Sequence, residues 1–321
     1  MSLIKENVSL KDYSNFKIGG PARYFLESKS LDELKAGLAE WQRIKSADAT
    51  VSGKIFIISG ATNILFDDAG FDGLILKNSI SYIEKNGNDM SEVGAGTSIK
   101  ELNEYCIDNS ISGMEWSGGL PGSVGGAVFG NAGAFGGEMK DSVVGVDSFD
   151  LNSGQIIKRN NLQCQFSYRQ SIFKSEKLPE IIISAEIQLK AGDRAEITGL
   201  IQDKIDYRVR KQPLEYPNIG SIFKNVDLKL ASPELVEKVR EKIKNDPFPV
   251  IPTAYLISLA GLKGKQIGGA QISEKHPNMF INRGEAKASE VKELMNITED
   301  SIFEKFGVHL EPEVRQLGQQ G

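Results

Sequence analysis

The chain has 321 residues, 40% of them hydrophobic and 25% charged, a composition typical of a globular protein with more than one packed unit. Its formal net charge of -5 at pH 7 gives no electrostatic reason to bind nucleic acid or an anionic membrane. The longest apolar runs are far shorter than the ~20 residues of a membrane-spanning helix, and we expect neither a span nor a signal peptide.

Cysteine and histidine are scarce. Cys106 and Cys164 are the only cysteines, and neither belongs to a C-x-x-C pair. We therefore expect two free thiols and a cytoplasmic protein. His276 and His309 are the only histidines, so we expect no metal site.

The first half of the chain predicts helices and strands in mixed order. Ser30 and Glu33 form a capping box that opens a helix reaching about Arg43. A second box, Ser98 with Glu101, opens another helix. The strands expected in this half are residues 54–59, residues 74–76 and short segments within 79–96.

The second half continues with strands and then changes character. The strands expected here are residues 143–151, 155–159, 181–189 and 278–282, with an extended end at 309–317. One helix is expected from a cap at Asp193 to about Arg210, before Pro213, and another starts at Ser232-Pro233. Thr253 is expected to cap a short helix that ends at residues 261–264, and Ser289 to open a helix that stops at Gly307. A change of unit is expected between residues 190 and 215.

Residues 121–138 read PGSVGGAVFGNAGAFGGE, with seven glycines in eighteen residues. Glycine lets backbone N–H groups approach a ligand closely, and such groups bind anions. The alternative is that two backbones simply pack closely here. The stretch lacks the G-x-G-x-x-G context of a Rossmann unit. Together with the tight turn GATN at 60–63, which follows a buried strand, it suits a long anionic cofactor such as FAD.

Eight sequence blocks occur in one order over residues 14–318. They are IGGPA, GATNIL with DDAGFDGLIL, VGAGTSIKEL, GLPGSVGGAVFGNAGAFGGE, FSYRQSIFK, GSIFKN, GLKGKQIGGAQISEKH and LEPEVR. In this order they resemble the signatures of the UDP-N-acetylenolpyruvoylglucosamine reductase family. The short spacing between FSYRQSIFK and GSIFKN resembles the subclass without an extra substrate loop. The chain departs from the family pattern at GATN for GGGSN, SGGLPG for SGIPG, and Val226 for proline.

The resemblance implies an α+β fold of the vanillyl-alcohol-oxidase (PCMH) type. Two α+β FAD-binding subdomains, residues 1–78 and 79–205, would precede a smaller α+β substrate-binding domain, residues 206–321. It also implies NADPH-dependent reduction of the enolpyruvyl sugar nucleotide to UDP-N-acetylmuramate through FAD, in bacterial peptidoglycan synthesis. FAD is the implied cofactor and NADPH the implied hydride-donating cosubstrate.

The cofactor-binding candidates are backbone-rich positions in the two glycine-containing segments. They are Gly60, Ala61, Thr62, Asn63, Gly122, Ser123, Gly125, Gly126, Asn131, Ala132 and Gly133.

Three residues match the catalytic positions of the family. Ser221 of GSIFKN matches the proton donor, and Glu313 of LEPEVR matches the catalytic carboxyl group, which burial would keep protonated. Arg169 of FSYRQS matches the arginine beside flavin and substrate carboxylate. Glu311 competes with Glu313, because alternation along a strand places both on one face.

The substrate-binding candidates are Tyr168, near Arg169, and three residues for the UDP diphosphate: Lys211, Lys224 and Asn225. Arg208 and Arg210 are adjacent alternatives to Lys211. Gln271, Ser273 and His276 lie in a segment that could line the site, and His276 is given no catalytic role.

Two other functions stay open at this point. One is a different oxidoreductase or oxidase on the same FAD scaffold, and the other is a nucleotide-sugar-binding protein without turnover. In each case the expected ligands are small molecules, and we expect a monomer without nucleic-acid or membrane partners.

Overall fold

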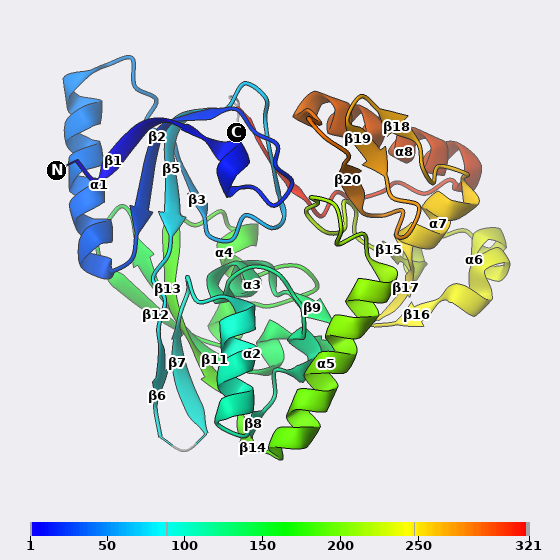
Figure 1. Cartoon of the computed structure of the whole chain (residues 1–321), viewed down its shortest axis with the longest axis horizontal. Helices are drawn as coiled ribbons and strands as arrows, with labels where there is room; N and C mark the ends of the chain where they lie inside the picture. The colour runs from blue at the N-terminus through cyan, green and yellow to red at the C-terminus, as the bar shows by residue number, and fades with distance from the viewer. Residues whose placement is uncertain (1, 88, 247, 319–321) are drawn as a thin grey trace. The chain divides into compact units, whose positions relative to one another are not determined.

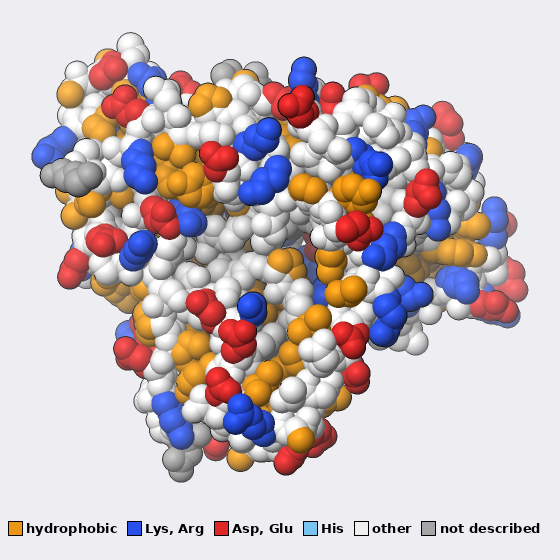
Figure 2. All heavy atoms as spheres, in the orientation of Figure 1, with side chains coloured by type: hydrophobic (Ala, Val, Ile, Leu, Met, Phe, Trp, Pro, Cys, Tyr) orange, Lys and Arg blue, Asp and Glu red, His pale blue; other side chains and the backbone are white. Residues whose placement is uncertain are grey.

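The computed structural model describes residues 2–87, 89–246 and 248–318 (Figure 1). The chain divides into two compact units. The first contains residues 1–8, 22–60 and 72–207, and the second contains residues 9–21, 61–71 and 208–321. The division into 1–78, 79–205 and 206–321 stays a prediction. Figure 2 shows basic and acidic side chains interspersed over the visible face.

The first unit begins with a sheet in the order β1 (Ile4–Ser9), β2 (Pro21–Ser28), β5 (Phe71–Asn78), β3 (Ile55–Ile58), in which β3 and β5 are parallel. Helix α1 (Leu31–Ala47) buries Leu34 and Trp41 against it. The Ser30 hydroxyl accepts a hydrogen bond from the Glu33 N–H at 3.1 Å, which confirms the predicted N-cap. The helix ends four residues later than expected.

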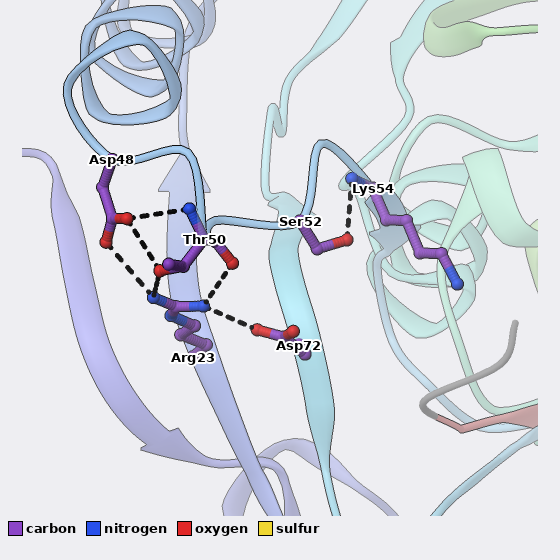
Figure 3. Close-up of polar contacts among 6 residues, drawn as sticks. All are labelled: Arg23, Asp48, Thr50, Ser52, Lys54 and Asp72. Carbon is purple, nitrogen blue, oxygen red and sulfur yellow. Dashed lines mark hydrogen bonds and ion pairs between the residues drawn. The ribbon is translucent and has the colours of Figure 1, made fainter.

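The loop after α1 is fastened to the sheet by Arg23 of β2 (Figure 3). Its guanidinium donates to the carbonyl of Thr50 at 3.1 Å and to the Asp72 carboxylate at 3.0 Å. Asp48 accepts from the Thr50 N–H at 2.8 Å. Because the loop leads directly into β3, these contacts help to fix the strand that ends just before Gly60.

A second sheet of the first unit has the order β12-β11-β13-β7-β6 and is antiparallel throughout. The strands are β6 (Ile83–Lys85), β7 (Met90–Gly94), β11 (Val143–Asp150), β12 (Ile156–Asn160) and β13 (Glu180–Gln188). The short pair β8 (Ile111–Ser112) and β14 (Lys190–Ala191) lies outside this sheet.

The other α-helices of the first unit are α2 (Ile99–Asp108), α3 (Val124–Gly130), α4 (Ile172–Ser175) and most of α5 (Arg194–Lys211). The predicted capping box of Ser98 and Glu101 is formed. Cys106 and Cys164 are buried free thiols, as predicted. Burial raises the pKa of Cys106 to about 12 and that of Cys164 to about 11, so both stay protonated at neutral pH.

A buried ion pair links three strands of the second sheet. The Arg159 guanidinium donates to both Glu180 oxygens, at 2.6 and 2.8 Å, and the Ser148 hydroxyl donates to Glu180 at 2.5 Å. The Glu180 side chain is only 3% exposed.

Arg159→Ala leaves this carboxylate buried without its cation, and we expect the free energy of unfolding to fall by about 3–5 kcal/mol. Urea unfolding measures this loss of stability. The control is Lys158→Ala, which removes an exposed ion pair with Asp147 and should cost less than about 1 kcal/mol.

In the second unit, the parallel pair β4 (Ile64–Phe66) and β21 (Arg315–Leu317) joins distant parts of the chain. Two small antiparallel sheets accompany it. They are β15 (Val226–Asp227), β17 (Pro249–Ile251) and β16 (Lys244–Asn245), and β18 (Gln266–Ile267), β19 (Ala270–Ile272) and β20 (Phe280–Asn282).

The helices of this unit are α6 (Pro233–Val239), α7 (Thr253–Leu259) and α8 (Ala288–Phe306). Two predicted starts were wrong by a residue: Pro252 precedes α7, whose first residue is Thr253, and Lys287 precedes α8. The Ser289 hydroxyl donates to Asp68 at 2.9 Å instead of capping the helix. Gly307, left-handed at φ 65°, ends α8 as predicted. Among the described residues, no helix is long and apolar enough to span a bilayer.

Candidate active site

Gly60, the first residue of the GATN turn, approaches the glycine-rich stretch within the first unit. Gly60 lies two residues after the end of β3 at Ile58. A Cβ atom placed on Gly60 would lie 2.9 Å from the Cα of Gly122. Gly122 itself has φ +107°, which a side chain would strain. The two backbones therefore meet at a distance that only glycine permits.

Helix α3 forms inside the glycine-rich stretch. Ser123 caps it by accepting from the Gly126 N–H at 3.3 Å. The N–H groups of Val124 and Gly125 donate to Thr97 and Ala95, at 2.9 and 2.8 Å. A Cβ on Gly125 would lie 2.7 Å from that of Ala95. At Gly125 the close-packing alternative thus describes what the structure shows.

A pair of substitutions separates close approach from glycine content. Gly60→Ala should force the Gly122 backbone to move, so we expect the purified protein to lose most of its flavin. Gly130→Ala, in α3 with no atom within 4 Å of the new Cβ, should retain flavin and gain about 0.4–1 kcal/mol of stability. Flavin absorbance per protein and urea unfolding check both. Equal flavin content in the two variants would contradict the role given to the Gly60 turn.

Asn131 connects the glycine-rich stretch to the FSYRQS segment. It is fully buried, left-handed at φ 42°, and ends α3. Its amide nitrogen donates to the Ser167 carbonyl at 3.0 Å, and its amide oxygen accepts from the Lys140 N–H at 3.0 Å. Both ends of its side chain are therefore engaged within the protein.

Arg169 occupies a tight turn in which Ser167 and Gln170 exchange backbone hydrogen bonds of 3.1 and 3.0 Å. Its φ of 57° is uncommon for a residue with a side chain and indicates local strain. The guanidinium donates to the Gly133 carbonyl at 2.8 Å and lies 5.0 Å from the ring centroid of Tyr168. The turn thus brings Arg169 against the glycine-rich stretch and Tyr168 beside Arg169.

In the second unit, the segments that carry Ser221 and Glu313 lie side by side. The Glu313 N–H donates to the carbonyl of Ile222 at 2.8 Å, and Phe223 forms a bridge with Pro312. Ser221 forms a bridge with Met279 on its other side. Ser221 and Glu313 are both partly buried. The fold therefore brings a hydroxyl and a carboxyl residue, far apart in sequence, onto adjacent extended segments.

Glu311, the competitor of Glu313, forms an ion pair. Its carboxylate accepts from the ammonium group of Lys224, and its carbonyl accepts from the Lys224 N–H at 2.9 Å. The Lys224 side chain is 11% exposed, whereas that of Glu311 is 67% exposed. The pair therefore joins the GSIFKN and LEPEVR segments through both side chain and backbone.

The remaining diphosphate candidates differ in exposure. The amide oxygen of Asn225 accepts from the Thr253 N–H at 3.2 Å, at the start of α7. Lys211 and Arg210 are exposed at the end of α5, whereas Arg208 is buried. Burial lowers the pKa of Arg208 to about 10, which still leaves it charged at neutral pH.

His276 lies in a turn that supports the Ser221 segment. Ser273 accepts from the His276 N–H at 3.2 Å, and the His276 carbonyl accepts from Met279 at 2.8 Å. Asn278, in the same turn, bonds to both the N–H and the carbonyl of Phe223, at 3.1 and 2.7 Å. Burial lowers the pKa of His276, which favours its neutral form. Gln271 donates to the Gly264 carbonyl at 3.0 Å.

Known proteins match this chain over almost its full length. An FAD-binding domain model matches residues 42–160, and a model of the UDP-N-acetylenolpyruvoylglucosamine reductase C-terminal domain matches residues 212–317. The reductase of Lactobacillus acidophilus is 36% identical over 99% of this chain and 96% of its own length. That of Fervidobacterium nodosum is 37% identical over 96% and 90%.

The chain belongs to the UDP-N-acetylenolpyruvoylglucosamine reductase family. The crystal structure of the reductase from Thermus caldophilus agrees, with a TM-score of 0.74, 27% identity and coverage of 97% of this chain and 98% of that one. The chain is accordingly an FAD-dependent oxidoreductase with an α+β FAD-binding fold followed by the family's C-terminal domain. The predicted fold class and enzyme class are confirmed.

Glu138 is a further candidate site residue, which the sequence analysis did not select. It is 5% exposed and pairs with the ammonium group of Lys140, but its Oε1 has no hydrogen-bond partner among the described residues. A Cβ on Gly133 would lie 2.7 Å from the Glu138 Cγ and 3.4 Å from an Arg169 guanidinium nitrogen. The available signal was charge: Glu138 is the only charged residue of the stretch 121–138.

Proposed function

We propose that this reductase family member uses NADPH to reduce the enolpyruvyl group of UDP-N-acetylenolpyruvoylglucosamine, yielding UDP-N-acetylmuramate for bacterial peptidoglycan synthesis. The observation that carries the proposal is the match to relatives of this name across 96–99% of the chain. The adjacent Ser221 and Glu313 segments support it, because the reaction needs a proton as well as a hydride.

The residues of the first unit fit FAD. The touching backbones of Gly60 and Gly122 leave no room for side chains, so main-chain groups can approach a pyrophosphate. Gly60, Gly122 and Ser123 are the proposed contacts nearest this point. The other predicted cofactor residues, with the exception of Asn63, are proposed as further contacts. When bound, FAD supplies a carrier that takes a hydride from NADPH and passes it to the substrate.

The side chains have three proposed tasks in the reduction. The hydride adds to the terminal methylene carbon, and Ser221 gives its proton to the neighbouring carbon, so the double bond becomes a single bond while NADPH becomes NADP+. Glu313 hydrogen-bonds the substrate carboxylate or relays the proton. Arg169 clamps that carboxylate through two parallel hydrogen bonds.

The substrate diphosphate is the proposed ligand of Lys211, Lys224 and Asn225, and Tyr168 packs near the enolpyruvyl group. Lys211 is exposed, whereas the ammonium group of Lys224 is paired with Glu311. We therefore propose that the Lys224 ammonium group, held in place by Glu311, attracts the diphosphate without moving. The exposed Lys211 side chain would turn toward the diphosphate when it binds. A cytoplasmic monomer completes the proposal.

One assay tests the function against its competitors. The purified protein should be yellow and should consume NADPH only when the enolpyruvyl sugar nucleotide is added. Oxygen consumption with an alcohol substrate, without a response to the sugar nucleotide, would support an oxidase. A protein that binds the sugar nucleotide without NADPH consumption would support the binding module.

A further inference from the structure

Asn63 is bonded twice to the segment that carries Glu313. Its side-chain amide nitrogen donates to the Glu313 carbonyl at 3.2 Å, and its backbone carbonyl accepts from the Arg315 N–H at 3.1 Å. The parallel pairing of β4 with β21 continues this register, with Ile64 opposite Arg315. One residue of the GATN turn thus holds the two peptides on either side of Val314.

The GSIFKN segment holds the same residues by further backbone hydrogen bonds. The carbonyl of Ile222, next to Ser221, accepts from the N–H groups of Glu313 and Val314, at 2.8 and 3.3 Å. Both main-chain polar groups of Glu313 are therefore engaged, its N–H by Ile222 and its carbonyl by Asn63. With the backbone fixed at both ends of the residue, the direction in which its side chain leaves is fixed as well.

We infer that Asn63 is a positioning residue for Glu313, acting by its amide hydrogen bond rather than by contact with the cofactor. Its place in the GATN turn predicts a cofactor ligand, but its donor group is directed at the carboxyl-bearing segment. The inference rests on the proposed function, because it concerns the step in which Glu313 takes part. A displacement of about 1 Å at such a group can slow a reaction about 100-fold.

The test separates the two half-reactions of the full-length, flavin-loaded protein. Asn63→Ala removes the donor, and Asn63→Asp keeps the shape but places an acceptor against the Glu313 carbonyl. We expect both variants to retain flavin and to be reduced by NADPH within about twofold of the unsubstituted rate. Reoxidation by the enolpyruvyl sugar nucleotide should slow by about 10- to 100-fold, mainly in its maximal rate.

A double-mutant cycle tests whether Asn63 acts through Glu313. In a Glu313→Gln background, Asn63→Ala should add less than about a twofold further loss, because residues that act as a unit are not additive. Asn109→Ala is the control: it removes one amide bond to a backbone carbonyl, that of Tyr105 at 2.9 Å, on an exposed helix end. It should leave both half-reactions unchanged.

Three results would overturn the inference. Loss of flavin, or equal slowing of both half-reactions, in both Asn63 variants returns the residue to the cofactor. An equal loss in the Glu313→Gln background shows that Asn63 does not act through Glu313. Normal reoxidation in both variants removes any role in this step. If the unsubstituted protein itself shows no substrate-dependent reoxidation, the proposed function has failed, which is a separate result.

Discussion

Ser221→Ala is expected to leave flavin reduction by NADPH nearly intact and to slow flavin reoxidation by the enolpyruvyl sugar nucleotide by about 100- to 10,000-fold. The range is that of a lost general acid. Ser221 lies on the segment bridged to Met279 and next to the Ile222 carbonyl that binds the Glu313 N–H. Removing its hydroxyl takes away one proton donor without disturbing these backbone contacts.

Stopped-flow absorbance of the flavin measures each half-reaction separately. Ser46→Ala is a matched control, since the hydroxyl of this exposed serine in α1 donates one hydrogen bond, to the Gln42 carbonyl at 2.8 Å. It should change neither rate. Equal slowing of reduction and reoxidation by Ser221→Ala would remove Ser221 from the proton-donor role.

Glu313→Gln and Glu311→Gln together decide which carboxyl group of LEPEVR takes part in the reaction. We expect Glu313→Gln to slow reoxidation by about 100-fold or more. Glu311→Gln should keep the maximal rate within a few-fold, because the Glu311 carboxylate is exposed and paired with Lys224. Glu311→Gln should instead change the substrate concentration needed for half-maximal rate, because the Lys224 ammonium group loses its anionic partner.

Rapid-mixing measurements over a range of substrate concentrations separate the two effects. Each variant replaces a glutamate by the isosteric glutamine, and the two sites are two positions apart in the sequence. Each variant therefore serves as the control of the other. A large loss of maximal rate in Glu311→Gln, with Glu313→Gln near normal, would exchange the two roles.

The sequence predicted local structure well wherever the signal was local. Ser30 and Ser98 mark helix starts, because a capping side chain bonds to a backbone group three residues away. Of the two, the full capping box forms only at Ser98, since the Glu33 carboxylate accepts from the Lys29 N–H and not from that of Ser30. The predicted starts at Thr253 and Ser289 were wrong by a residue. In both cases the hydroxyl is used elsewhere, by Lys224 for Thr253 and by Asp68 for Ser289.

Site roles depended more on tertiary contacts. The glycine-rich stretch predicted a close backbone approach, but only the folded chain shows that Gly122 of this stretch meets Gly60. The Lys224 ammonium group is paired with Glu311, a residue that comes late in the sequence. For Glu138 the sequence offers only its isolated charge, and the fold adds its burial and an oxygen without a hydrogen-bond partner among the described residues.

The sequence by itself determined the helix caps and tight turns, since these are encoded in neighbouring residues, and the order of its blocks resembles that of one FAD-dependent reductase family. Only the tertiary structure decided that Asn63 bonds to the Glu313 backbone and that Ile222 carries Glu313 beside Ser221. The reason is physical: a hydrogen bond between residues far apart in sequence depends on where the whole chain places its backbone groups, and no local pattern records that placement.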